Sequence, residues 1–197
     1  MGQILAEGAF MRRVLVSLLV LAGCATAPVP SAAPQWKLLS ATPDVTEIQV
    51  QTSDSLNRAT VTDAGARGPF LNLTRASGRL QGTLRVDQPV DVTVNGTEIQ
   101  GRVAGDAFDL TLMPDGDETR ATGLTRGMPS TFWLSPQRIR GNIGACRFDV
   151  IWGAGNYTGG RTCGARSETV TLRIPAALAS WSEPEAAALL VMITIRS

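Results

Sequence analysis

The chain offers few residue types that could carry out catalysis. It contains no histidine and one lysine, Lys37, so a Ser-His-Asp or Cys-His mechanism has no base and a histidine metal site has no ligands. Phosphate-binding, dinucleotide-binding and Gly-x-Ser-x-Gly motifs are also missing from the sequence. Carboxylates remain, and Asp91, Asp109 and Asp149 occupy matching positions in three similar segments. Each alternates with apolar neighbours as a solvent-facing residue does, so we expect no enzymatic activity and no cofactor.

The acidic segment Asp115-Gly116-Asp117-Glu118 is the best candidate for a metal site in the sequence. Clustered carboxylates suit calcium, but the segment lacks the full spacing of a calcium-binding loop. An acidic hairpin tip is the commoner origin of such a segment. We therefore expect a turn here and no bound metal.

Two of the three cysteines are spaced for a cross-strand disulfide. When the strands are counted outward from a two-residue turn at Ala154-Gly155, Cys146 faces Cys163 at a non-hydrogen-bonded position. Cα atoms at such positions lie about 4.5 Å apart, which a disulfide tolerates. The spacing is not that of a redox-active C-x-x-C pair. We expect a structural disulfide, worth about 3 kcal/mol in the chain-entropy model.

The third cysteine, Cys24, follows a segment typical of a secretory signal peptide. Met11-Arg12-Arg13 supplies positive charge, residues 14–20 are apolar, and small residues precede the cysteine. Leu21-Ala22-Gly23-Cys24 resembles the lipobox of bacterial lipoproteins. The resemblance implies that the Cys24 thiol is diacylated with fatty acids such as palmitate. It also implies that the preceding peptide is removed and that the new amino terminus is acylated.

The resemblance also implies a location. Two or three acyl chains hold a protein at a membrane essentially permanently, so we expect a membrane-anchored protein of the cell envelope. Ala25 stands where an Asp would resemble the inner-membrane retention signal, which implies transport to the outer membrane in a diderm bacterium. We expect Met11 to be the true start of the protein, because Glu7 interrupts residues 1–10.

Composition divides the chain into three parts. Residues 1–23 form the expected signal peptide. Residues 24–35 contain the expected lipidated cysteine and a spacer rich in proline and alanine, a composition that favours extended, solvated conformations. Residues 36–197 are long enough for a single domain with one core.

From residue 45 onward, apolar and polar residues alternate with a period of two. Strands with one buried and one solvated face are typical of antiparallel sheets, and turn signals such as Asn95-Gly96 separate the runs. We therefore expect an all-β domain, an antiparallel meander that forms a curved barrel or a two-sheet sandwich, with a short C-terminal helix. The clearest runs are residues 48–50, 90–94, 108–112 and 170–174.

A weak internal repeat supports the hairpin interpretation. An apolar-x-Gly segment precedes an apolar-Asp-apolar segment three times, at 80–82 and 90–92, at 99–101 and 108–110, and at 139–141 and 148–150. A duplicated propeller blade or solenoid unit is one interpretation. We favour the convergence of hairpins of similar length, with the glycine of each copy marking a bend or bulge.

The carboxyl end departs from the period of two. Residues 175–179 predict a helical turn that begins with proline, and Ser182-Glu183-Pro184-Glu185 resembles a capping box at the start of a short helix. We expect residues 191–195 to form a terminal strand. This apolar segment should lie in the core, because an exposed one would aggregate.

Charge is unevenly distributed along the expected domain. Residues 36–118 carry seven basic and twelve acidic side chains, a net charge of −5, whereas residues 119–167 carry seven arginines and Asp149 alone, a net charge of +6. On the expected solvent-facing side, Arg138, Arg140 and Arg147 are candidates for an anionic contact. The alternative is that these arginines serve solubility and pair within the domain. Arg161 falls on the inner side and needs a partner or a route to solvent.

Three classes of function are compatible with these features. We favour a non-catalytic structural or interaction module of the envelope, whose partners would be the membrane through its anchor and an anionic lipid, a cell-wall polymer or another envelope protein. We expect no nucleic-acid partner. A carrier of a small apolar or amphipathic ligand is the first alternative, with the glycines at 82, 101, 141 and 159–160 providing interior space. A carboxylate-based hydrolase is the least favoured.

Overall fold

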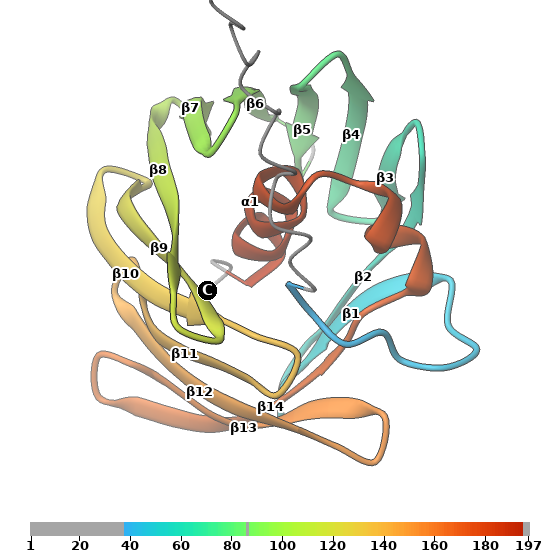
Figure 1. Ribbon diagram of the computed structural model, residues 1–197, viewed down its shortest axis with the longest axis vertical. Helices are drawn as coiled ribbons and strands as arrows, with labels where there is room; N and C mark the ends of the chain where they lie inside the picture. The colour runs from blue at the N-terminus through green and yellow to red at the C-terminus, as the bar shows by residue number, and fades with distance from the viewer. Residues whose placement is uncertain (1–37, 86, 195–197) are drawn as a thin grey trace, which may run out of the picture. The chain divides into compact units, whose positions relative to one another are not determined.

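The computed structural model describes residues 38–85 and 87–194. They form a closed antiparallel barrel in which consecutive strands are neighbours and the last strand pairs with the first. Figure 1 shows the barrel with a helix inside it. The strands are β1 (Glu47–Gln51), β2 (Leu56–Thr62), β3 (Gly65–Gly68), β4 (Leu71–Ala76), β5 (Arg79–Leu84), β6 (Gln88–Asn95), β7 (Glu98–Val103), β8 (Asp106–Asp115), β9 (Glu118–Thr125), β10 (Met128–Leu134), β11 (Arg138–Ile143), β12 (Cys146–Gly153), β13 (Asn156–Cys163) and β14 (Arg166–Arg173).

The alternation of apolar and polar residues produces this wall. In β8, for example, Phe108, Leu110 and Leu112 are buried and face the interior, while the residues between them face outward. Short turns join the strands, and Ala154 and Gly155 both have positive φ angles, as a two-residue hairpin turn requires. The predicted all-β meander is therefore confirmed, and it closes into a barrel instead of forming a sandwich.

The repeated glycines lie where the backbone of a neighbouring strand leaves no room for a side chain. Gly82, Gly101 and Gly141 sit in the hairpins β5–β6, β7–β8 and β11–β12, with φ angles of +149°, +156° and +120°. A Cβ atom on Gly82 would lie 1.9 Å from the carbonyl oxygen of Asn72 on the preceding strand. Only glycine fits such a position. The register runs through these glycines without a bulge, and the three copies are hairpins of one barrel, not blades of a propeller or turns of a solenoid.

The helix α1 (Glu183–Thr194) occupies the interior of the barrel. Every residue from Pro184 to Thr194 is buried, so the helix has no solvent-facing side. The predicted terminal strand at 191–195 is wrong, because residues 191–194 continue this helix. The physical reason is that a closed barrel leaves no free edge for another strand. A helix satisfies its own backbone hydrogen bonds in an apolar interior.

Both ends of α1 are held by polar contacts. At its start, the backbone N–H of Ser182 donates to the Glu185 carboxylate at 2.9 Å, which confirms the predicted capping interaction. Arg75 also donates to that carboxylate, at 2.8 Å. At its end, the guanidinium of the buried Arg161 donates to the carbonyl of Thr194 at 3.3 Å. A positive charge beside the C-terminal carbonyls complements the helix dipole.

A short strap crosses the barrel mouth before α1 begins. The predicted helical turn is the 3-10 helix η1 (Ala176–Ser180), which follows Pro175. Trp181 then packs down on the mouth, where its indole N–H donates to the carbonyl of Thr62 at 2.9 Å. On the other side of the same mouth, the Tyr157 hydroxyl accepts from the backbone N–H of Ser40 at 2.8 Å. These contacts tie the strap and the segment around Ser40 to the end of the barrel through which the helix enters.

The predicted hairpin register of β12 and β13 is confirmed. Gly153 pairs with Asn156, and the register runs outward to Cys146 opposite Cys163. These two cysteines form a disulfide with their Cα atoms 4.2 Å apart. Arg161, which the register placed on the inner side, is buried and forms an ion pair with Glu168 on β14.

Several sequence expectations fall outside the described residues. They are the signal peptide at 1–23, Cys24 and the spacer at 24–35, together with the expected start at Met11. Within the described part of the chain, no helix combines the length and the apolar content that are needed to cross a membrane.

Candidate functional site: an arginine hollow on the barrel wall

The three candidate arginines lie around one hollow on the outer face of the barrel. The hollow has a volume of about 430 Å³ and opens over the strands β10, β11 and β12. We name it the arginine hollow. Its lining residues are Thr131, Trp133, Arg138, Arg140, Gly141, Asn142, Arg147, Phe148 and Asp149.

Strand register brings these residues together. Trp133 on β10 pairs with Arg140 on β11, and Arg140 pairs with Asp149 on β12, so the three form a row across the sheet. They face outward because their neighbours along the strands, such as Phe132 and Ile139, are buried on the inner side.

Two of the arginines are fixed by carboxylates. Arg138 donates to both oxygens of Asp149, at 2.9 and 2.8 Å. Arg140 donates to both oxygens of Glu118 on β9, at 3.3 and 2.6 Å. Such two-pronged contacts hold a guanidinium in one plane. The hydrogen bonds from Arg138 lower the pKa of Asp149, so this carboxylate stays ionised at neutral pH.

Trp133 forms the aromatic side of the arginine hollow. The Cζ atom of Arg140 lies 4.6 Å from the centroid of the Trp133 ring, which is a cation–π contact. The indole N–H donates to Asp115 at 2.7 Å. Trp133 and Glu118 were not predicted as site residues. Three residues, 135–137, separate β10 from β11, and the register that pairs Leu134 with Ile139 across this turn also pairs Trp133 with Arg140.

Arg147 differs from the other two arginines. It is exposed, and it forms no ion pair with any residue that the structure describes. Glu118 and Asp149 balance two of the three positive charges, which leaves one uncompensated guanidinium on the β12 side of the hollow. Asp115 places an acidic group on the opposite, Trp133 side.

The charge contrast along the sequence is partly cancelled in the folded barrel. Ion pairs join the acidic segment to the arginine-rich one at Arg126–Asp106, Arg140–Glu118 and Arg166–Asp54. The alternative of pairing within the domain therefore applies to most of these arginines. Of the three predicted arginines, Arg138 and Arg140 form ion pairs within the domain. Arg147 forms none within residues 38–85 and 87–194.

Comparisons with protein-family models, with curated proteins and with solved structures give no match.

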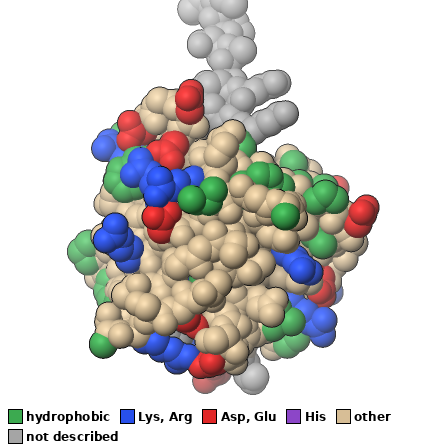
Figure 2. Space-filling model, turned by 90° about the horizontal axis from the view of Figure 1, so that it is seen from below, with side chains coloured by type: hydrophobic (Ala, Val, Ile, Leu, Met, Phe, Trp, Pro, Cys, Tyr) green, Lys and Arg blue, Asp and Glu red, His purple; other side chains and the backbone are tan. Residues whose placement is uncertain are grey.

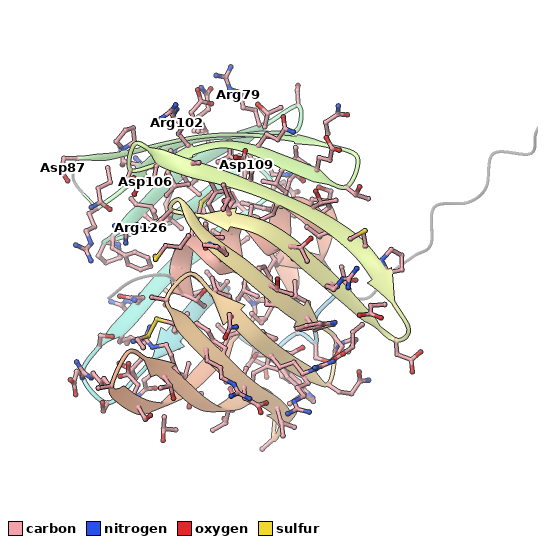
Figure 3. The ribbon with its side chains drawn as sticks, turned by 90° about the vertical axis from the view of Figure 1, so that its left-hand side faces the viewer. Arg79, Asp87, Arg102, Asp106, Asp109 and Arg126 are labelled. Carbon is pink, nitrogen blue, oxygen red and sulfur yellow. A yellow bond between two sulfur atoms is a disulfide. The ribbon has the colours of Figure 1, made fainter. Side chains whose placement is uncertain are left out.

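A similar ion pair lies on the other side of the barrel. On β5 and β6, Arg79 donates to both oxygens of Asp91, each at 2.8 Å. In Figure 1 these strands lie across the barrel from β12 and β13, and in Figure 3 Arg79 points away from the wall. An arginine–aspartate pair alone is therefore not the distinguishing feature of the site.

Most of the other carboxylate candidates bind arginine or tryptophan side chains, whereas Asp109 on β8 forms no ion pair with a described residue. Asp91 and Asp149 are tied to arginines, and the predicted acidic turn at 115–118 directs Asp115 to Trp133 and Glu118 to Arg140. Among the residues that the structure describes, no cluster of three or more potential metal ligands occurs.

The interior offers little space for a carried ligand. The hollow beside Leu190 of α1 measures about 10 Å³, and one between Met192 and the turn residues Arg85, Ala104 and Arg126 measures about 30 Å³, whereas ligand pockets usually measure roughly 300–1,000 Å³. A larger hollow of about 460 Å³ lies at the mouth, between residues 38–41 and the strap. One oxygen of Glu183 is buried there without a described partner, and burial raises the pKa of Glu183 to about 7.

Proposed function

We propose that this protein is a lipid-anchored module of the bacterial cell envelope that binds anionic envelope material through the arginine hollow, without catalysis. The observation that carries the proposal is the gathering of Arg138, Arg140 and Arg147 with Trp133 at one hollow of the outer wall. The anchor is Cys24, in a segment that resembles a lipobox.

The architecture favours binding on the outer face over carrying a ligand inside. Because α1 fills the barrel, a carried molecule would have to displace a buried twelve-residue helix. The outer hollow needs no such movement. Two of its guanidinium groups are oriented by carboxylates while keeping further N–H donors, and Arg147 adds an exposed positive charge that forms no ion pair with a described residue.

The test measures co-sedimentation of the chain from residue 24 onward, with Cys24→Ser, with anionic vesicles and with purified cell wall. The variant carries Arg138→Gln, Arg140→Gln and Arg147→Gln. The matched control carries Arg58→Gln, Arg79→Gln and Arg102→Gln, three exposed arginines of other strands. We expect the hollow variant to lose about tenfold or more in affinity and the control to lose far less, with binding that weakens as salt is added.

Equal losses in the two variants would contradict a site at the hollow, because they would indicate attraction by net charge alone. An absence of sedimentation at low salt with both materials would contradict anionic binding altogether. The anchor is tested separately in the full chain, where Cys24→Ser should abolish fatty-acid labelling. Labelling that persists in that variant would contradict the lipoprotein assignment.

A further inference from the structure

An uncharged strip of hydroxyl side chains covers the outer face beside the arginine hollow. It consists of the outward positions within residues 158–162 of β13 and 167–171 of β14, and we name it the hydroxyl strip. Figure 2 shows this side of the barrel, with uncharged polar side chains and backbone at its centre and charged side chains around its margin. The hydroxyl strip comprises Thr158, Gly160, Thr162, Ser167, Thr169 and Thr171.

The hydroxyl strip continues the central row of the arginine hollow. Trp133, Arg140 and Asp149 pair in register, Asp149 pairs with Gly160, and Gly160 pairs with Thr169. This row crosses five neighbouring strands, which at about 4.8 Å between strands is a path of roughly 19 Å. A Cβ atom on Gly160 would meet nothing within 4 Å, so the path is open where it passes from one surface to the other.

The side chains of the path suit a ligand that is dense in hydroxyl groups. Threonine and serine hydroxyls both donate and accept hydrogen bonds, and threonine loses little freedom because its χ1 angle is already restricted. Thr162 and Ser167 already share a hydrogen bond of 2.9 Å across the strands. Arg138 and Asp149 add fixed donors and ionised acceptors at the next strands.

The same surface is poorly suited to the other partners. Protein interfaces depend on buried aromatic and large apolar anchors, and the hydroxyl strip has none. Anionic membranes attract clusters of about four to eight basic residues, whereas the arginine hollow has one uncompensated charge, at Arg147. Arg147 pairs in register with Thr162, so this charge stands at the border of the hydroxyl strip.

We propose that the arginine hollow and the hydroxyl strip together bind an acidic polysaccharide chain. Its sugar rings lie along the row from Trp133 to Thr169, and an acidic substituent lies against Arg147. Asp115 at the Trp133 side disfavours a second acidic group there, which orients the chain. This inference rests on the proposed function, since it names the class of anionic material that the hollow recognises.

The test measures Kd for three probes with the chain from residue 24 onward carrying Cys24→Ser. The probes are an alginate oligosaccharide, a neutral cello-oligosaccharide of equal length, and phosphatidylglycerol vesicles. One variant carries Thr158→Val, Thr162→Val and Thr169→Val, which remove hydroxyls and keep the side-chain shape. Its control carries Thr60→Val, Thr74→Val and Thr93→Val at exposed positions of other strands. A second variant is Arg147→Gln.

We expect alginate to bind best, and both the strip variant and Arg147→Gln to raise its Kd on the order of tenfold, with the control unchanged. Vesicle binding without alginate binding would overturn this inference and leave the proposed function standing. Alginate binding that depends on Arg147 but not on the strip would do the same. Equal binding of the neutral probe would overturn the acidic assignment, and no binding of alginate or vesicles would overturn both proposals.

Discussion

The hairpins β5–β6 and β11–β12 share one inner pattern and differ on their outer faces. Both place a glycine opposite an apolar residue, Gly82 opposite Val90 and Gly141 opposite Phe148, and both carry an arginine–aspartate pair outside. The hairpin β11–β12 also has an aromatic neighbour, Trp133, and a hollow over it. The third copy, β7–β8, has Glu98 at the position of the arginine.

This difference separates the inward-facing residues, which determine the barrel, from the outward-facing residues, which form the candidate site. The inner glycine and apolar residues recur because every hairpin must curve around the same interior. The outer residues are free to vary, since solvent accepts many side chains. A candidate site on this barrel is therefore indicated by outward-facing residues that differ between the similar hairpins, not by residues that the hairpins share.

The largest expected effect comes from breaking the shared inner pattern in either hairpin. Gly82→Ala would bring a Cβ atom 1.9 Å from a backbone oxygen and Gly141→Ala one 2.5 Å away, both at positive φ. Each should lower the free energy of unfolding by about 3 kcal/mol or more, measured by denaturant titration. Gly160→Ala, where the space is open, should change it by less than about 0.5 kcal/mol. Tolerance of one inner substitution but not the other would show that the two hairpins are not built alike.

The disulfide sharpens the comparison, because it joins β12 to β13 and no counterpart joins the described strands around β5–β6. Replacing Cys146 and Cys163 with alanine should cost about 3 kcal/mol, a fall in Tm of roughly 6–12 °C for a chain of this size. Amide hydrogen exchange should accelerate in β12 and β13 and stay unchanged in β5 and β6. In the native protein, both cysteines should resist alkylation until reductant is added. Free thiols, or acceleration spread evenly over the barrel, would contradict this prediction.

The packing of the barrel interior can also be tested through α1, whose Leu190 lies against β11 and β12. Glu183, at the start of this helix, provides the test. Burial raises the pKa of Glu183 to about 7 from 4.5, so the folded protein retains a proton that the unfolded chain releases. Stability should therefore fall as the pH rises from about 4.5 to 7 and level off above that. Glu183→Gln should remove this slope and raise the Tm at pH 8 by roughly 2–4 °C, the effect of about 1 kcal/mol once solvent screening is allowed for.

Glu185→Gln is the control for that measurement. Burial alone would raise the pKa of Glu185, but hydrogen bonds from Arg75 and Ser182 outweigh it and the pKa lies below its usual value. This carboxylate stabilises the fold in its charged form, so its replacement should lower the Tm at pH 8. A rise in Tm for both variants would contradict the assigned roles.

The smallest effect is expected from the outer ion pairs themselves. Arg79→Gln and Arg138→Gln should each leave the Tm unchanged within error, because exposed ion pairs contribute little to stability. Their effects on binding should differ, with only Arg138→Gln weakening it. A clear fall in the Tm of Arg138→Gln alone would contradict this prediction. It would show that the Arg138–Asp149 pair stabilises the fold.

The sequence predicts the strands and one register well, because local signals suffice for them. The turn at Ala154-Gly155 and the spacing of Cys146 and Cys163 determine the pairing of β12 with β13. The C-terminal segment is different. Val191 and Ile193 have strand propensity, yet they lie in a helix because the barrel has closed and only its interior remains. No local pattern contains that information.

The site is predictable to a similar degree. Alternation places Arg138, Arg140 and Arg147 on the outer face of adjacent strands, so their proximity follows from the sequence. Their ion pairs do not. Arg140 reaches Glu118 across the intervening strand β10, and such a contact depends on side-chain conformations and on the curvature of the wall.

The closure of the barrel through β1 and β14 has a consequence for how the chain folds. Gln49 pairs with Arg173, so the first strand receives its second neighbour only after nearly all of the barrel has been synthesised. Hairpins can form in order as the chain emerges, but until the end β1 keeps an exposed edge, which is a template for aggregation. The segment that fills the interior comes still later in the chain, after β14. Removal of α1 would therefore leave the apolar inner face of the strands without the helix that packs against it, and the interior is filled only after the last strand has been made.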